Sequence, residues 1–262
     1  MMTATSTFAV VMPTTTQEET VTIEAPKYVF YLIGDGLGFS QRQMAEYYLQ
    51  SITGDDSRKL VMDTLPVSGI NTTYSADSLI TDSAAAGTAL ACGIKTANGV
   101  IAEDLEGNAV TSLIEAAEAK GMKTGLVSTT RITHATPATF ASHNSSRDDE
   151  NGIALDYVDS GVDFIAGGGA RHFLASTTPA NTKDYSGETM KSKRKDDVDV
   201  IAEFEKVGYS TYIGKEGTDA LMAEDFADDE KVFAVLTNSH LPYEIDRQNL
   251  YPELPSIGEL TD

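Results

Sequence analysis

The sequence predicts an α/β protein with a mostly parallel, doubly wound sheet and helices on both faces. Short apolar runs rich in β-branched residues alternate with stretches of helical periodicity, an order typical of β-α-β units. Several of these runs end in glycine, as strands do where the chain turns. The 262 residues, 41% of them hydrophobic, suffice for a buried core. The triple glycine at 167–169 is not a Gly-x-Gly-x-x-Gly fingerprint, so a dinucleotide site is not supported.

The first 25 residues have the composition of a segment outside the folded domain. They are rich in Thr, Ala and Ser and carry one short apolar patch at residues 8–12. They lack the basic start and the long apolar core of a complete signal peptide. We expect residues 1–25 to be a signal-peptide remnant or disordered, and residues 26–262 to form the domain. Because no apolar run reaches about 18 residues, no membrane span is expected.

The first strand and helix of the domain are expected close to residue 30. The near-continuous apolar run from Lys27 to Ile33 is typical of a central strand in a parallel sheet. It ends at Asp35, between two glycines, where open α/β sheets place their ligands. Asp35 is either a turn residue or a metal carboxylate that the glycines allow to approach an ion. We expect a helix over residues 40–50 and a short strand over 69–74.

A helix of small residues is expected to begin at Ser83. Thr81 or Asp82 can cap its first turn, and Gly93 can end it in a left-handed conformation. Unpaired N–H groups and the helix dipole favour an anion at such a start, so the Ser83 hydroxyl is placed to meet a phosphate. The alternative is that Ser83 is one more capping residue. Cys92, the single cysteine, lies in the same helix and is expected to be a buried structural thiol.

The remaining elements alternate as the β-α-β order requires. The lysine-dense residues 176–197 are expected to form a surface loop. Ser256 and Glu259 have the spacing of a capping box, which predicts the start of a helix. The other expected elements are helices over residues 110–120 and 199–207 and strands over residues 123–128, 162–166 and 232–236.

The charge balance narrows the possible partners. The chain has 40 acidic and 19 basic residues, a formal net charge of −21. This excess argues against binding the phosphate backbone of nucleic acids or an anionic membrane surface. It favours a solvated, salt-adapted surface, with cation binding as the minority interpretation. An anionic substrate would need local positive charge, which bound metal ions can supply.

Three motifs place chemically active side chains after successive strands. They are Gly-Asp-Gly-Leu-Gly around Asp35, Thr-Asp-Ser-Ala-Ala-Ala around Ser83, and His-Ala-Thr-Pro-Ala from His134 followed by Ser-Arg at Arg147. They supply a carboxylate, a hydroxyl nucleophile and a guanidinium. The set resembles the alkaline phosphatases, and the likeness runs from about residue 26 to the end. The resemblance implies the three-layer α/β sandwich of that family.

The resemblance also implies a phosphomonoesterase with two zinc ions and one magnesium ion. Ser83, activated by zinc, would attack phosphorus and form a phosphoseryl intermediate, which a metal-bound water would hydrolyse. Asp35 would bridge zinc and magnesium, and Thr136 would bind magnesium. Arg147 would hold two phosphate oxygens in its planar fork, and Asp82 would orient it.

The four histidines carry different expectations. The position of His134 holds aspartate in some members of the resembling family and histidine in others, where it acts near the magnesium site. His134 is therefore either a weak metal ligand or a structural residue. His143, His172 and His240 match no ligand motif and are expected to be structural or exposed.

The chain departs from the family pattern in its metal ligands. In alkaline phosphatases a glutamate, an Asp-x-x-x-His, an Asp-His pair and a further histidine lie in the carboxyl-terminal half, and neither histidine motif occurs here. Tight zinc sites require three protein ligands. We therefore expect an amino-terminal fragment of an alkaline phosphatase with negligible activity alone. The resemblance further implies small phosphomonoester substrates, a periplasmic or secreted location, and a homodimer when the protein is full length.

Other functions remain open on the residues alone. A non-catalytic, degenerate relative that binds phosphate or a cation would keep the helix-start anion site without the metals. A serine esterase is disfavoured because Ser83 lacks the Gly-x-Ser-x-Gly elbow. A sulfatase-like protein is disfavoured because neither Ser83 nor Cys92 lies in a Cys/Ser-x-Pro-x-Arg motif.

Overall fold

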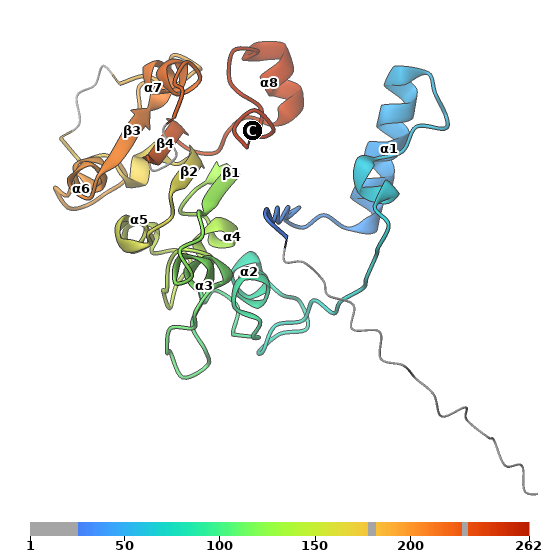
Figure 1. Ribbon diagram of the computed structural model, residues 1–262, viewed down its shortest axis with the longest axis horizontal. Helices are drawn as coiled ribbons and strands as arrows, with labels where there is room; N and C mark the ends of the chain where they lie inside the picture. Colours follow the sequence, from blue (N-terminus) through green and yellow to red (C-terminus); the bar gives the residue numbers. More distant parts are fainter. Residues whose placement is uncertain (1–25, 178–181, 227–229, 262) are drawn as a thin grey trace, which may run out of the picture. The chain divides into compact units, whose positions relative to one another are not determined.

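The computed structural model in Figure 1 describes residues 26–177, 182–226 and 230–261. The chain divides into two compact units, Met1–Gly34 and Asp35–Asp262. Of the first unit, only residues 26–34 are described, so the expectation for residues 1–25 lies outside the described residues. All named helices and strands belong to the second unit.

The centre of the second unit is a parallel sheet, as the sequence predicts. Its strands have the order β1-β2-β4-β3, and all three neighbouring pairs are parallel. This order requires crossover connections, because a parallel neighbour cannot be reached through a tight hairpin. The strands are β1 (Gly125–Arg131), β2 (Phe164–Gly168), β3 (Tyr209–Ile213) and β4 (Lys231–Thr237).

Helices connect and flank the strands (Figure 1). They are α1 (Phe39–Thr53), α2 (Ser83–Cys92), α3 (Leu113–Glu118), α4 (Ala135–Ala138), α5 (Glu150–Asp159), α6 (Val200–Lys206), α7 (Gly214–Leu221) and α8 (Glu244–Leu250), with 3-10 turns η1 (Val61–Thr64) and η2 (Ala170–His172). The α/β prediction is confirmed by this alternation of helices with parallel strands.

An aromatic cluster forms much of the core beside β4. Phe233 on β4 and Phe204 on α6 are fully buried. Their rings stack with centroids 3.9 Å apart, and Tyr209 meets Phe204 edge to face at 5.0 Å. Phe173, which follows η2, lies 4.8 Å from Phe233. Large aromatic side chains in such contacts contribute much of the hydrophobic stabilisation of a domain, so β4 and α6 are fixed together.

Several element ends follow the local signals of the sequence. Asp199 caps α6 by accepting the N–H of Ala202, and Ser112 forms a full capping box with Glu115 at the start of α3. That box makes α3 begin later than the predicted helix over 110–120. The predicted strands at 123–128, 162–166 and 232–236 correspond to β1, β2 and β4.

Two predicted strands are absent. Residues 27–33 and 69–74 are described, and neither segment forms a strand. Most of their apolar side chains are exposed, with Leu32 87% and Ile70 93% exposed, whereas Ile33 is half-buried. A strand needs a hydrogen-bonded neighbour, whereas apolar, β-branched composition indicates only that a segment suits a buried sheet. The two segments therefore have the composition of strands but no neighbouring strand with which to form hydrogen bonds in the described residues.

The predicted helix after Ser256 is also absent. The capping box itself is present: Ser256 Oγ accepts the N–H of Glu259, and a Glu259 carboxylate oxygen accepts the N–H of Ser256. The described residues that follow form turns. Separately, among the described residues no helix is both long and apolar enough to cross a membrane.

Candidate active site

The site is organised by the first turn of α2. Asp82 caps this helix by accepting the N–H of Ala85 at 2.9 Å, and Gly93 ends it at φ +73°. Close packing fixes the helix further along, since a Cβ on Gly87 would lie 2.7 Å from Thr139 Oγ1. The predicted helix is therefore confirmed, and Ser83 is its first residue.

Ser83 lies beside Asp35 and Thr136. The Ser83 hydroxyl donates to the Asp35 carboxylate, with Oγ 3.1 and 3.2 Å from the two oxygens. The Thr136 hydroxyl donates to Asp35 Oδ2 at 3.3 Å. These side chains come from the start of α2, from the turn before α1 and from α4. One carboxylate thus holds two hydroxyls that lie far apart in the sequence.

Arg147 is held next to the start of α2 by Asp82. Its Nη1 donates to Asp82 Oδ2 at 3.0 Å, and the same oxygen accepts the N–H of Gly99. Burial works to raise the pKa of Asp82, but the hydrogen bonds from Ala85 and Arg147 outweigh it, so the pKa falls below its ordinary value. An ionised Asp82 therefore fixes both the helix start and one edge of the guanidinium.

His134 lies on the other side of the Arg147 guanidinium. Its Nε2 is 3.3 Å from Arg147 Nη2, while its Nδ1 is buried and has no hydrogen-bond partner in the described part of the chain. Burial, followed by the charges of Arg147 and Arg131, lowers the pKa of His134. A neutral imidazole with one unused nitrogen is available to a ligand, a water or a cation.

Comparison with known proteins identifies the family to which this chain belongs. The sequence model of the family described as alkaline phosphatase matches residues 26–262. The chain belongs to the alkaline phosphatase family. It is 37% identical over 244 residues to alkaline phosphatase 3 of Bacillus subtilis, which covers 90% of this chain and 46% of that relative. It is 35% identical over 243 residues to the repressible alkaline phosphatase of Saccharomyces cerevisiae, with 89% and 41% covered.

Solved alkaline phosphatases share the fold. The enzyme of the Antarctic bacterium TAB5 matches with a TM-score of 0.67 and 28% identity, over 87% of this chain and 58% of that one. The Thermus thermophilus enzyme matches with a TM-score of 0.69 and 33% identity, over 87% and 43%. The resemblance inferred from the motifs is thereby confirmed. The chain spans about half the length of the curated relatives it matches.

At this site, the described part of the chain provides few metal donors. Among the described residues, no group of three or more His, Cys, Asp or Glu side chains is placed to hold a metal ion. Asp35 is the carboxylate that contacts the hydroxyls of Ser83 and Thr136. The second carboxylate, that of Asp82, accepts hydrogen bonds from Arg147 and from backbone N–H groups. This donor set suits magnesium, which is held through one or two carboxylates and keeps several waters. It does not supply the three ligands of a tight zinc site.

A second polar cluster adjoins the site and was missed by the sequence motifs. Arg131, the last residue of β1, forms a bidentate pair with Glu150, both distances being 2.7 Å. Its backbone N–H donates to His240 Nδ1, and the His240 ring lies 5.5 Å from that of His134. The only available signal was the position of Arg131 and His240 just after predicted strands.

The remaining predicted residues have structural partners. His143 contacts Glu115 and the carbonyl of Ala102, each at 2.8 Å, and His172 contacts Asn151 at 2.9 Å. The Cys92 thiol donates to the carbonyl of Val110, and burial raises its pKa to about 11. A thiol in that state is protonated at neutral pH and unreactive.

Proposed function

We propose that this chain supplies the nucleophile and the phosphate clamp of a phosphate monoester hydrolase. The observation that carries the proposal is the convergence of Ser83, Arg147 and Asp35 at the start of α2. A hydroxyl, a guanidinium and a helix N-terminus are three groups that bind a phosphate dianion together. Membership of the alkaline phosphatase family supports the same reaction class.

Arg147 is the clamp in this proposal. Asp82 engages one edge of the guanidinium through Nη1, and His134 lies near Nη2. Pairing with Asp82 restrains the side chain before substrate arrives, so less conformational entropy is lost when two phosphate oxygens are bound. Asp82 is thus a positioning residue, because it acts on the phosphate through Arg147.

Ser83 is the nucleophile. Its Oγ forms a bond to phosphorus while the bond from phosphorus to the ester oxygen breaks, and the alcohol leaves with a proton from water. The Oγ proton, which the hydroxyl donates to Asp35 before the substrate binds, passes through water to the leaving alcohol. Water then attacks the phosphoserine, the bond from Oγ to phosphorus breaks, and Ser83 regains its proton.

Asp35 and Thr136 would hold a magnesium ion at this site. A bound divalent cation would supply positive charge beside the phosphate, in a chain whose net charge is −21. A related TAB5 alkaline phosphatase with a histidine-to-glutamate substitution has been solved with magnesium bound. The two zinc ions stay a prediction of the family resemblance, because the described residues do not complete a zinc site.

We also propose that the 262-residue chain alone has negligible turnover. A carboxylate is a weak base toward a serine hydroxyl, so Asp35 without a zinc site generates little alkoxide. The chain spans 46% of one bacterial relative and 41% of a fungal one. Its own residues are therefore sufficient for phosphate binding and insufficient for rapid hydrolysis. Small phosphomonoester substrates, a periplasmic or secreted location and a full-length homodimer remain part of this proposal.

The decisive experiment separates binding from turnover. Phosphate binding is measured calorimetrically in Mg²⁺ for the wild type, Arg147→Gln and the matched surface variant Lys206→Gln, whose lysine forms an exposed pair with Glu203. We expect Arg147→Gln to weaken binding roughly tenfold and Lys206→Gln to leave it unchanged. Equal affinities in all three would overturn the clamp.

Hydrolysis of 4-nitrophenyl phosphate is then measured with Mg²⁺ and Zn²⁺ together. We expect no rate above that of Ser83→Ala. A metal-dependent rate well above that variant would show that the chain is catalytically sufficient and would contradict the negligible turnover. Phosphate binding without turnover in any longer form of the protein would instead favour the non-catalytic, phosphate-binding alternative.

A further inference from the structure

Three neighbouring strands deliver basic side chains to one edge of the sheet. β1 ends at Arg131, β2 is followed by Arg171 in η2, and β4 is followed by His240. β2 lies between β1 and β4, so these residues meet at the carboxyl end of the sheet, where open α/β folds bind ligands. The proposed phosphate clamp uses none of them directly.

The backbone at this edge is built for close approach. Gly169 has φ +105°, and a Cβ there would lie 2.9 Å from the Cβ of Arg131. A Cβ on Gly168 would lie 2.1 Å from the carbonyl oxygen of Ser239. Only glycine fits such contacts without a backbone shift. The ends of β1, β2 and β4 are therefore packed tightly enough to hold Arg131, Arg171 and His240 as one group.

This group has more hydrogen-bond donors than acceptors. Arg131 Nη1 lies 2.7 Å from His240 Nε2, and the backbone N–H of Arg131 lies 3.1 Å from His240 Nδ1. Both contacts require an accepting nitrogen, whereas a neutral imidazole has one acceptor and an imidazolium has none. In at least one of these two contacts an N–H of Arg131 therefore faces an N–H of His240. An anionic oxygen bound there would accept hydrogen bonds from both groups.

Nearby acceptors are already used. Glu150 accepts both ends of the Arg131 fork and the Thr133 hydroxyl. Arg171 Nε donates to His172 Nε2 at 3.1 Å, and its Nη atoms meet no carboxylate in the described ranges. Arg171 is half-buried and His240 is exposed, so a ligand can reach both. The two guanidinium groups of Arg131 and Arg171 share one carboxylate, that of Glu150, so positive charge exceeds negative charge here although the chain's net charge is −21.

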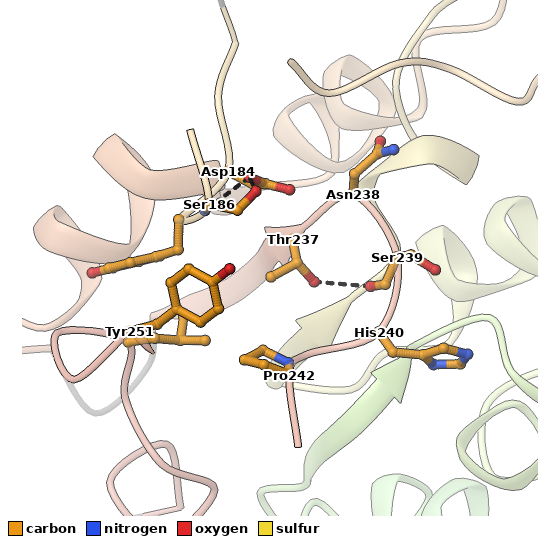
Figure 2. Close-up of a pocket in the computed structure, with 10 residues that line it drawn as sticks. Asp184, Ser186, Thr237, Asn238, Ser239, His240, Pro242 and Tyr251 are labelled. Atoms are coloured by element: carbon orange, nitrogen blue, oxygen red, sulfur yellow. Dashed lines mark hydrogen bonds between the residues drawn. The ribbon is translucent and has the colours of Figure 1, made fainter. Parts of the chain in front are cut away.

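A pocket lies next to this group. A cavity of about 330 Å³ opens at the carboxyl end of β4 and is lined by Thr237, Pro242, Tyr251, His240 and others. In Figure 2 the His240 ring lies on the side of the pocket away from Tyr251. The His240 ring lies 5.5 Å from the His134 ring, which itself contacts Arg147. His240 therefore lines the pocket and also belongs to the series of contacts that leads through His134 to Arg147.

We propose that Arg131, Arg171 and His240 form a second anion subsite, which binds a second oxyanion of the substrate. The substrate class is then phosphomonoesters that carry a further phosphate or carboxylate. The first phosphate lies on Arg147 and Ser83, and the second oxyanion lies between Arg171 and His240. This inference rests on the proposed function, because the clamp must hold the first phosphate.

The test compares butyl phosphate with butane-1,4-diol bisphosphate by calorimetry at fixed ionic strength in Mg²⁺. For the wild type and for the matched charge variant Lys206→Gln, we expect the bisphosphate to bind roughly tenfold more tightly. For Arg171→Gln we expect the advantage to fall below about twofold with butyl phosphate affinity unchanged. An equal advantage in Arg171→Gln and Lys206→Gln would overturn the subsite.

Two further measurements keep the result independent of misfolding and of the clamp. Arg171→Lys keeps the charge and should keep most of the advantage. The chain has four histidines, so the Hε1 NMR signal of His240 should move with the bisphosphate and not with butyl phosphate, while His143 stays fixed; an unmoved His240 signal would contradict the subsite. If Arg147→Gln binds butyl phosphate as tightly as the wild type does, the proposal that Arg147 holds the first phosphate is wrong. The loss of the bisphosphate's affinity advantage in Arg171→Gln still tests the second subsite separately.

Discussion

The helix α1 and the strand β4 belong to the same unit but differ in what their apolar residues do. α1 has 15 residues and none is buried, although Phe39, Met44, Tyr47 and Ile52 are among them. β4 has seven residues, and all but Lys231 are buried. From residue 39 to residue 82, all described, Ser75 is the one buried residue. Apolar residues are therefore necessary for a hydrophobic core, but their presence in a segment does not ensure that the segment is buried.

The difference lies in long-range neighbours. β4 pairs with β2 and β3 and packs against α6, so each apolar side chain meets several others. α1 is held by its own backbone ladder and its left-handed end at Gly54. A helix that buries nothing is marginal, because most helix stability in proteins comes from packing an apolar face. We expect the two regions to respond very differently to the same kinds of substitution.

The largest effect is expected from matched aromatic truncations. Phe233→Ala removes a fully buried ring stacked on Phe204 and should lower the free energy of unfolding by about 3–5 kcal/mol. Phe39→Ala removes a ring that is 76% exposed and should change it by less than about 0.5 kcal/mol. Urea unfolding followed by circular dichroism measures both. A Phe39→Ala loss as large as that of Phe233→Ala would show that α1 is packed in solution.

A smaller effect is expected from matched glycine substitutions. Gly168→Ala places a methyl group 2.1 Å from the carbonyl oxygen of Ser239 and should lower the free energy of unfolding by about 1–3 kcal/mol. Gly69→Ala meets no atom within 4 Å and needs no left-handed backbone, so it should be neutral or slightly stabilising. Thermal unfolding of the two variants is the measurement. A tolerated Gly168→Ala would mean that the strand ends are not closely packed.

Local signals in the sequence predicted the elements whose ends depend on nearby residues. Asp82 and Gly93 mark the two ends of α2 as expected, and Asp199 caps α6. Such ends are determined locally, by a side chain that accepts an N–H three residues on or by a glycine in the left-handed conformation. The strand β3 was not predicted, since Tyr209–Ile213 mixes aromatic and polar residues. Its place beside β4 is a long-range property. The same limit explains the wrong prediction of a strand over residues 27–33.

The candidate site shows the same division. The motifs singled out Asp35, Ser83 and Thr136 individually, but their contacts join residues 48 and 101 positions apart. Only likeness to a known family could indicate that they meet. The Arg131–His240 contact spans 109 positions and belongs to no motif used in the prediction. The spacing of residues predicts contacts within one helix turn or one strand, but it does not predict which distant segments meet in the folded protein.

The last comparison separates two histidines of the second unit, His143 and His172, by the sign of their pH dependence. Burial opposes protonation of His143, but the bond to Glu115 outweighs it and raises the pKa of His143. The contribution of His143 to the free energy of unfolding, about 0.5–1 kcal/mol, is fully present below the unfolded-state pKa of about 6.5 and is lost as pH rises through the folded-state pKa.

Burial lowers the pKa of His172 to about 4, despite the opposing charge of Glu150. The unfolded chain therefore binds the His172 proton first, and stability falls as pH drops from about 6.5 toward 4. Urea unfolding between pH 4 and 9 should show His143→Gln flattening the alkaline side of the profile and His172→Gln flattening the acidic side. Identical profiles for the two variants would contradict opposite roles for these imidazoles, and a pH response arising from exposed carboxylates such as Asp55 would remain unchanged in both.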